Sequence, residues 1–129
     1  MQINIPAVKA EMEAEFARYE KALVSNDVET LEALFWDCGN TIRYGVGENL
    51  YGMNAIRAFR QARSPVGLAR RLEQTVITTF GTDFATASTL FVRDSAAGKI
   101  GRQMQSWVRM EGSWKVVAAH VSIIADPAT

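Results

Sequence analysis

Hydrophobic residues near the start of the chain recur every three or four positions, which is the spacing of one face of an α-helix. The residues on this face are Val8, Met12, Phe16, Tyr19 and Leu23. Asn4 is a candidate cap, and Pro6 suits the first helical turn. The polar run at 25–27 ends this helix, and Asn26 with Glu29 resembles a capping box that begins a second one.

Two further helices and a short strand are predicted before residue 64. The second helix should end near residues 37–40, and its hydrophobic residues share one face: Val28, Leu31, Leu34 and Phe35. A short strand is expected over Thr41–Tyr44, followed by a glycine-containing loop that runs to Gly52. Residues 53–63 form the third predicted helix, with Ile56 and Phe59 facing inward.

The second half of the chain is rich in β-branched and aromatic residues, which favour strands. Four strands are predicted over 70–80, 84–93, 100–110 and 114–124. Their short connections contain turn residues, so neighbouring strands should pair antiparallel. Helices first and a strand meander afterwards predict an α+β fold. Three N-terminal helices should pack on one antiparallel sheet, in a single domain over residues 1–129.

The last predicted hairpin indicates which side chains share a face of the sheet. The dipeptide at 112–113 suits a type II′ turn, and the resulting register gathers one set of residues on one face: Gln103, Gln105, Trp107, His120 and Ser122. The opposite face is nearly apolar. Because the helices can cover only one of these faces, the other is predicted to pack against a second copy in a homodimer.

Composition and the lack of certain motifs argue against several classes of partner and cofactor. The 129 residues carry 14 basic and 14 acidic side chains, and this zero net charge argues against nucleic-acid binding. The sequence contains neither a membrane span nor a secretory signal, so the cytoplasm is the expected location. One His, one Cys and the absence of clustered carboxylates predict no metal site. Phosphate-loop and dinucleotide motifs are also absent, so no cofactor is expected.

Each candidate polar residue has two interpretations. Tyr19 is either a core tyrosine or a hydroxyl that points into a cavity under the first helix. Arg43 is either a strand-edge residue in solvent or an ion pair, or it is a clamp for an anion. Arg60 is expected to reach solvent, whereas Arg63 either does the same or shares the inward helix face. His120 is either a hydrogen-bonded core residue or a titrating group.

Four stretches of the chain resemble a known group of proteins: residues 41–45, 79–87, 101–109 and 114–122. Three helices, a long-stranded meander and the ending from Trp114 to Ser122 resemble the NTF2-like superfamily, also described as cystatin-like or SnoaL-like. More narrowly, nearly the whole chain resembles a small bacterial family linked to oxalurate catabolism and to cyanuric-acid breakdown.

The resemblance implies a curved sheet wrapped around helices, a cone-shaped cavity and a dimer. One branch of that family is a cofactor-free decarboxylase of a carboxylated urea. It relies on a Tyr in the first helix and an Arg in the following short strand, and the matching positions here are Tyr19 and Arg43.

Three functions are therefore weighed. In the first, Tyr19 supplies a proton for decarboxylation of an N-carboxylated urea, and Arg43 orients a retained or central polar group. The remaining candidate binding residues are Arg63 for a second carboxylate and Gln103, Gln105, His120 and Ser122 for the urea core. The second function is a non-catalytic protein that binds a small carboxylate or docks to a neighbouring amidohydrolase. The third is a dehydratase or isomerase, which would need an acidic residue in the cavity; Asp83 and Asp94, both at hairpins, are poorly placed for it.

Overall fold

The computed structural model describes residues 1–128. Its helices are α1 (Pro6–Val24), α2 (Val28–Leu34) and α3 (Met53–Ala62). Its strands are β1 (Ile42–Tyr44), β2 (Asn49–Tyr51), β3 (Arg71–Phe80), β4 (Phe84–Val92), β5 (Lys99–Met110) and β6 (Ser113–Ala125), with a 3₁₀ turn over Asp94–Ala96. The predicted α+β class is confirmed, and the strand β2, which the sequence pattern left as loop, is an addition to it.

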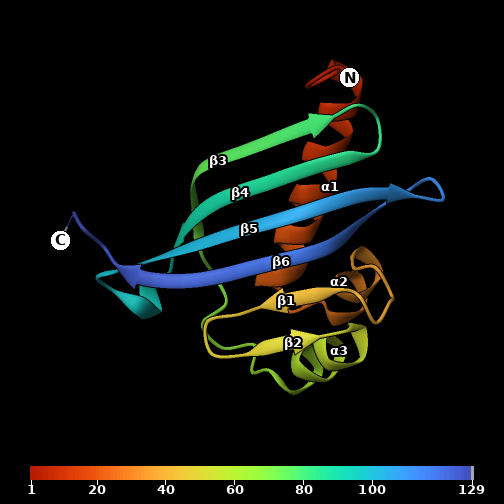
Figure 1. Ribbon diagram of the computed structural model, residues 1–129. Coiled ribbons are helices and arrows are strands. Elements are labelled where there is room, and N and C mark those ends of the chain that lie inside the picture. The colour runs from red at the N-terminus through yellow and green to blue at the C-terminus, as the bar shows by residue number, and fades with distance from the viewer. Residues whose placement is uncertain (129) are drawn as a thin grey trace.

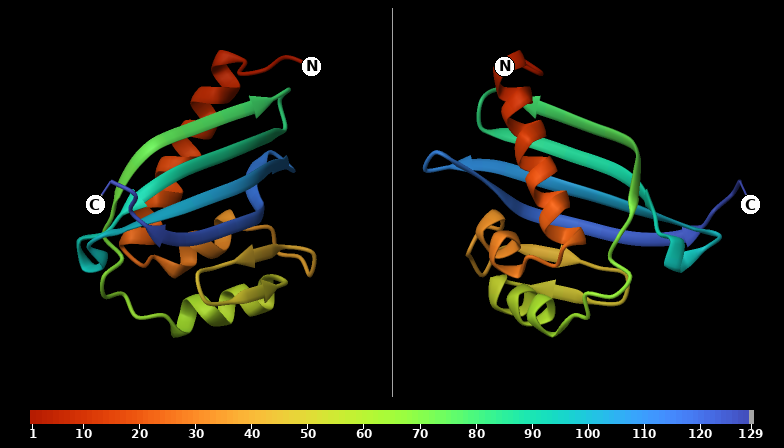
Figure 2. Two further views of the ribbon diagram at one scale, coloured as in Figure 1. Left: turned by 60° about the vertical axis from the view of Figure 1, so that its left-hand side comes forward. Right: turned by 180° about the vertical axis from the view of Figure 1, so that it is seen from behind.

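One curved sheet contains all six strands, in the order β2-β1-β6-β5-β4-β3 (Figure 1). The pairs are antiparallel except for β1 with β6, which run parallel. The helix α1 crosses one face of the sheet, and α2 and α3 lie beside β1 and β2 (Figure 2). The parallel pair brings the short early strand β1 next to the long final strand, so residues from both ends of the chain meet near α1.

The predicted hydrophobic face of α1 is buried against the inner face of the sheet. All five residues of that face are at most 7% exposed, and they join Leu31, Leu34 and Trp107 in one core. Burying this stripe stabilises the helix far more than its intrinsic propensity does. No helix among the described residues combines the length and hydrophobicity that a membrane crossing requires.

The predicted helix caps differ from those in the structure. Asp27, and not Asn26, caps α2, because its carboxylate accepts a hydrogen bond from the Thr30 amide at 3.2 Å. Asn26 lies at φ +52° in the turn before the cap. Asn4 does not cap α1; its side-chain oxygen accepts a hydrogen bond from the Thr79 amide at 2.9 Å, so it fastens the N-terminus to β3.

The register predicted for the last hairpin is wrong in two respects. The turn contains Glu111 and Gly112, both at positive φ as a type I′ turn requires, and Arg109 pairs with Trp114. The register then shifts by one residue, because Val117 is the extra residue of a bulge between the pairs of Trp107 and Ser106.

The bulge reverses the faces of the rest of β6. Gln103 and Gln105 do point to the inner face with Trp107, and each is at most 3% exposed. His120 and Ser122 point to the outer face instead, where His120 is exposed and its ring lies 6.0 Å from that of Tyr44. The predicted polar cluster of five residues on one face is therefore divided between two faces.

The Phe91 ring of β4 packs directly over the backbone of its partner in β5, Gly101. A Cβ atom at residue 101 would overlap this ring, which is 2% exposed and has no room to move away. The absence of a side chain at Gly101 therefore decides where Phe91 lies.

We predict that Gly101→Ala lowers the free energy of unfolding by about 1–3 kcal/mol, the usual cost of overpacking a core. Urea denaturation measures this change. Gly39→Ala is the matched control, because an added Cβ there has no neighbour within 4 Å. Equal losses in the two variants would contradict this account of the packing.

The outer face of the sheet presents large apolar side chains to solvent. Tyr51 and Met104 are each 62% exposed and Val76 is 60% exposed. A shallow hollow lined by residues of β1, β4, β5 and β6 lies on this face, with Met104 in its wall. An apolar surface of this kind is typical of protein–protein contacts.

The homodimer inferred from the sequence stays a prediction, and this face is its expected interface. We expect the chain to sediment as a dimer at micromolar concentration and Met104→Glu to shift it towards monomer. Val66→Glu is the control, because Val66 is 83% exposed in the loop between α3 and β3. A parent protein that sediments as a monomer would refute the interface.

Candidate functional site

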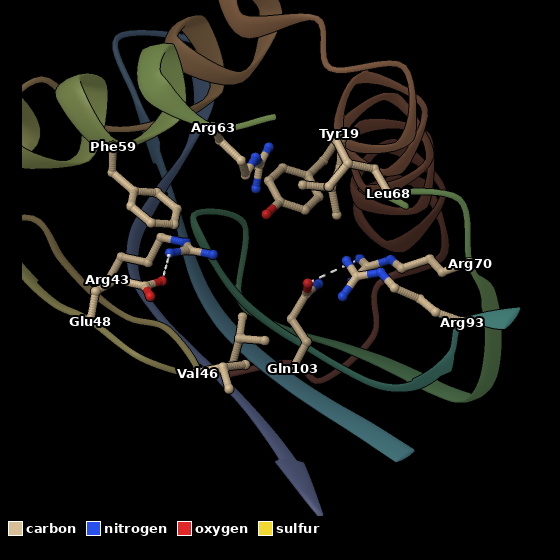
Figure 3. A pocket seen from close by; sticks show the side chains of 12 residues that line it. Tyr19, Arg43, Val46, Glu48, Phe59, Arg63, Leu68, Arg70, Arg93 and Gln103 are labelled. Carbon is tan, nitrogen blue, oxygen red and sulfur yellow. Dashed lines mark hydrogen bonds and ion pairs between the residues drawn. The ribbon is translucent and has the colours of Figure 1, made fainter. Parts of the chain in front are cut away.

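A cavity of about 190 Å³ lies between the C-terminal half of α1 and the inner face of the sheet (Figure 3). Segments from most of the chain contribute to its wall. The lining residues are Tyr19, Leu23, Arg43, Val46, Glu48, Phe59, Arg63, Leu68, Arg70, Arg93, Gln103 and Val121. Apolar side chains thus alternate with four arginines in a space large enough for a small organic molecule.

Tyr19 occupies the wall formed by α1 and is 2% exposed. Its ring packs between two aromatic neighbours, with centroids 6.3 Å from Phe35 and 6.2 Å from Trp107. This contact fixes the ring, and the hydroxyl points into the cavity (Figure 3). The two interpretations of Tyr19 therefore combine, because the ring belongs to the core while the oxygen faces the empty space.

The charges around Tyr19 favour its ionised form. Burial raises the pKa of Tyr19, but the positive charges of Arg60, Arg43 and Arg70 together lower it further, so the pKa lies below its ordinary value. These arginines come from three different parts of the chain: α3, β1 and the segment before β3. A tyrosine with a lowered pKa gives up its proton more readily than an ordinary one.

Arg43 lies on the inner face of β1 and is 7% exposed. One terminal nitrogen donates a hydrogen bond to Glu48 at 2.9 Å, and the guanidinium carbon lies 5.2 Å from the centre of the Phe59 ring. Gly45 makes this ion pair possible, because a Cβ atom there would overlap the Glu48 carboxylate. The remaining nitrogen points towards the cavity and Tyr19 (Figure 3).

The opposite wall holds a second pair of arginines. Arg70 donates two hydrogen bonds to the Glu20 carboxylate, at 2.8 and 2.5 Å, and one to the Gln103 oxygen at 3.0 Å. Because arginine only donates, it fixes which way the Gln103 amide points. Arg70 and Arg93 both lie over the Phe91 ring, at 4.5 and 4.8 Å from its centre.

Arg63 follows α3 and closes the cavity from the side of the helices. It donates a long hydrogen bond of 3.5 Å to the Asn26 side chain. Burial and the nearby positive charges of Arg60 and Arg43 lower its pKa to about 10. The guanidinium stays charged near neutrality, and its low pKa reflects a local excess of positive charge.

The balance of charges makes the cavity a site for an anion. Four arginines line it against Glu48 alone among the lining residues that the structure describes, and Glu20 adds one carboxylate behind Arg70. Two cationic regions face each other, one at Arg43 and one at Arg70 and Arg93 (Figure 3). A carboxylate at either region would receive charge-assisted hydrogen bonds.

The predicted site residues divide into three groups. Tyr19, Arg43, Arg63 and Gln103 line the one cavity. Gln105 is buried beside it, where its oxygen accepts a hydrogen bond from the Trp107 indole at 3.0 Å. His120 and Ser122 do not reach the cavity because the β6 bulge turns them outward, and the Ser122 hydroxyl accepts a hydrogen bond from Arg102.

Several residues around the cavity were missed by sequence reasoning: Glu20, Glu48, Arg60, Arg70 and Arg93. The prediction that Arg60 reaches solvent is wrong, because its side chain is 1% exposed. A signal was present, since Met53, Ile56 and Arg60 are three and four positions apart and share the buried face of α3. For Glu20, Glu48, Arg70 and Arg93, no hydrophobic periodicity in the sequence indicates that they lie at the cavity.

The acidic residues needed for the third function lie elsewhere. Asp83 is at the β3–β4 turn and pairs with Arg109, and Asp94 begins the 3₁₀ turn after β4. Neither residue lines the cavity around Tyr19. Within residues 1–128, no three His, Cys, Asp or Glu side chains gather as potential metal ligands.

Comparison with known proteins agrees with the fold and the sequence resemblance. A protein of unknown function from Pectobacterium atrosepticum is 56% identical to this chain, with a TM-score of 0.93 and 95% of each chain covered. A cystatin-like fold protein from Burkholderia xenovorans is 51% identical, with a TM-score of 0.94 over 98% of this chain and 99% of its own.

More distant similarity extends to the wider superfamily. An NTF2-like protein of unknown function from Pseudomonas putida is 19% identical, with a TM-score of 0.74 over 90% of this chain and 86% of its own, and supports the fold alone. No curated protein sequence matches the chain. The AtzH-like family model matches residues 1–127. The chain therefore belongs to the AtzH-like family, within the NTF2-like proteins of cystatin-like fold.

Proposed function

We propose that this protein is a cofactor-free decarboxylase that removes a carboxylate from an N-carboxylated urea. The observation that carries the proposal is the meeting of the Tyr19 hydroxyl and the Arg43 guanidinium in one cationic cavity. Membership of the AtzH-like family, which is linked to cyanuric acid and allophanate catabolism, supports a urea-derived carboxylate as substrate.

The reaction requires a proton at the urea nitrogen. As the bond between this nitrogen and the carboxylate carbon breaks, its electron pair goes to the nitrogen and the carboxylate leaves as carbon dioxide. In the proposed mechanism Tyr19 donates its hydroxyl proton to that nitrogen and then regains a proton from water. A positioned acid of this kind accelerates a reaction by ~10²–10⁴-fold. Its lowered pKa makes Tyr19 a stronger acid than an ordinary tyrosine.

The arginines position the substrate for this proton transfer. Arg43 binds a polar group that remains after the reaction, because equally strong binding of the departing carboxylate before and during bond breaking would not lower the barrier. Arg63, Arg93 and Gln103 line the same cavity and hold the other polar groups. Fixing the substrate between the two cationic regions turns a random encounter into one defined geometry.

A non-catalytic binding protein could use the same cationic cavity, so turnover must be tested separately from binding. The position of Tyr19 favours catalysis, since a neutral phenol adds little to the capture of an anion by four arginines. Its hydroxyl is the one polar group that can donate a proton from the wall formed by α1. Loss of this hydroxyl should abolish turnover if the protein is an enzyme, and it should change little if the protein only binds the anion.

We expect Tyr19→Phe to reduce carbon dioxide release from N-carboxylated ureas by at least ~10²-fold while thermal stabilisation by oxalurate persists. Arg43→Ala should lose both turnover and stabilisation, because it removes a charge that binds the anion. Tyr51→Phe is the matched control, since Tyr51 lies exposed on the outer face. Equal rates in all these proteins would end the assignment. Stabilisation by oxalurate without any product would identify a binding protein.

We also predict the pH dependence of turnover. Only the protonated phenol can donate, so carbon dioxide release should fall as the pH rises through the pKa of Tyr19. Because Arg60, Arg43 and Arg70 lower this pKa, the fall should occur below the pH range in which an ordinary tyrosine ionises. A pH–rate profile measures it, and the residual activity of Tyr19→Phe should lack this limb. A rate that increases through the same range would contradict an acid role.

A further inference from the structure

Arg60 carries a positive charge in the interior of the protein. It projects from α3 and is 1% exposed. None of its three side-chain nitrogens reaches full hydrogen-bond geometry with the described residues, but the guanidinium lies close enough to the Tyr19 hydroxyl to lower the pKa of Tyr19. The guanidinium lies over the Phe35 ring, 4.6 Å from its centre. Burying an unpaired charge costs several kcal/mol, so a chain selected only for stability would not keep it.

Among the groups around Arg60, Tyr19 is the one whose ionised form this positive charge can stabilise. The Phe35 ring contacts both residues, since the Tyr19 ring lies 6.3 Å from it on centroids. Glu32 of α2 also acts on Arg60, but its carboxylate binds Gln61 and pairs with Arg57. The other charged groups around Tyr19 are Arg43 from β1, Arg63 after α3, and Arg70, which pairs with Glu20 of α1.

Arg60 differs from these other arginines because it does not contact the space that a substrate would occupy. Arg43 pairs with Glu48, Arg70 pairs with Glu20, and both line the cavity. Arg60 does not line the cavity, so a bound carboxylate would not neutralise it. Among the charged groups, Arg60 also has the strongest electrostatic effect on Tyr19.

We propose that Arg60 is a positioning residue for Tyr19, buried against the same Phe35 ring as the counter-charge of its phenolate. This proposal rests on the proposed function in one respect, namely that the proton of Tyr19 goes to a urea nitrogen. The effect of Arg60 on the ionisation of Tyr19 does not depend on a substrate and can be measured in the free protein. When the Tyr19 oxygen gives its proton to the urea nitrogen, the phenolate is formed beside a buried cation. Such preorganised charge stabilises developing charge without any reorganisation of solvent. Water then returns a proton to the phenolate, and Arg60 keeps its own protons throughout.

The test compares neutral and charged replacements of Arg60. Arg60→Met and Arg60→Gln remove the charge, and Arg60→Lys keeps it. Arg57→Met is the control, because it removes a positive charge from a partly exposed position of the same helix. Ultraviolet absorbance of tyrosinate is titrated in the free proteins, and Tyr19→Phe separates the signal of Tyr19 from those of Tyr44 and Tyr51. We expect the pKa of Tyr19 to rise by about one unit or more in the neutral variants, a tenfold weaker acid. It should stay near the parent value in Arg60→Lys and Arg57→Met.

Two further measurements separate this role from a structural one. The neutral variants should unfold at temperatures no lower than the parent, because they bury no unpaired charge. Their kcat for carbon dioxide release should fall by about 10- to 100-fold with little change in KM, and the alkaline limb should move to higher pH.

The outcomes distinguish the two proposals. An unchanged ionisation of Tyr19 in the neutral variants overturns the role of Arg60, whatever the protein does to ureas. Loss of folding in both neutral variants also overturns it, because it assigns Arg60 to stability. A raised pKa of Tyr19 in a protein that releases no carbon dioxide confirms the counter-charge and refutes the proposed function.

Discussion

Concentrated positive charge in a small interior space is the constraint on which the rest of this structure depends. Arg43, Arg63, Arg70 and Arg93 line one cavity, and Glu48 and Glu20 are the carboxylates bound to two of them. Arg60 is buried as well, without lining the cavity. Like charges this close repel each other, so the fold must hold them in place. An anionic ligand would relieve the repulsion, which links binding to the stability of the site.

Aromatic rings and glycines provide the support for these charges. Phe59, Phe35 and Phe91 each present a face to at least one guanidinium, an attractive contact that needs no carboxylate. Gly45 leaves room for the pair of Arg43 and Glu48. The support is therefore largely apolar, and it leaves the nitrogens of several arginines available to a ligand.

A single extra residue in β6 defines the boundary of the site. The bulge at Val117 places Ala119 and Val121 on the inner face, and Val121 lines the cavity. It places His120 on the outer face beside Tyr44 and Tyr51, away from the arginines. The histidine that the sequence offered as a titrating group is thus separated from the site, and the titrating candidate that remains in the cavity wall is Tyr19.

The sequence by itself determined the order and type of nearly every element. The helical stripe of α1 and the strand-forming second half depend on local periodicity, which is readable without coordinates. The placement of Tyr19, Arg43, Arg63 and Gln103 near one another followed from that periodicity together with the family resemblance. The prediction for Arg60 is wrong because it places Phe59 on the inward stripe of α3, whereas Met53 and Ile56 share their buried face with Arg60.

Only the tertiary structure decided which charged groups meet. Glu20 and Arg70 are 50 residues apart, and neither the pairing of β1 with β6 nor the bulge in β6 leaves a local pattern in the sequence. A bulge changes side-chain direction by one residue, so a small error in register moves every later residue to the opposite face. A fold class can be predicted correctly despite such an error, whereas a list of the residues that line a cavity cannot.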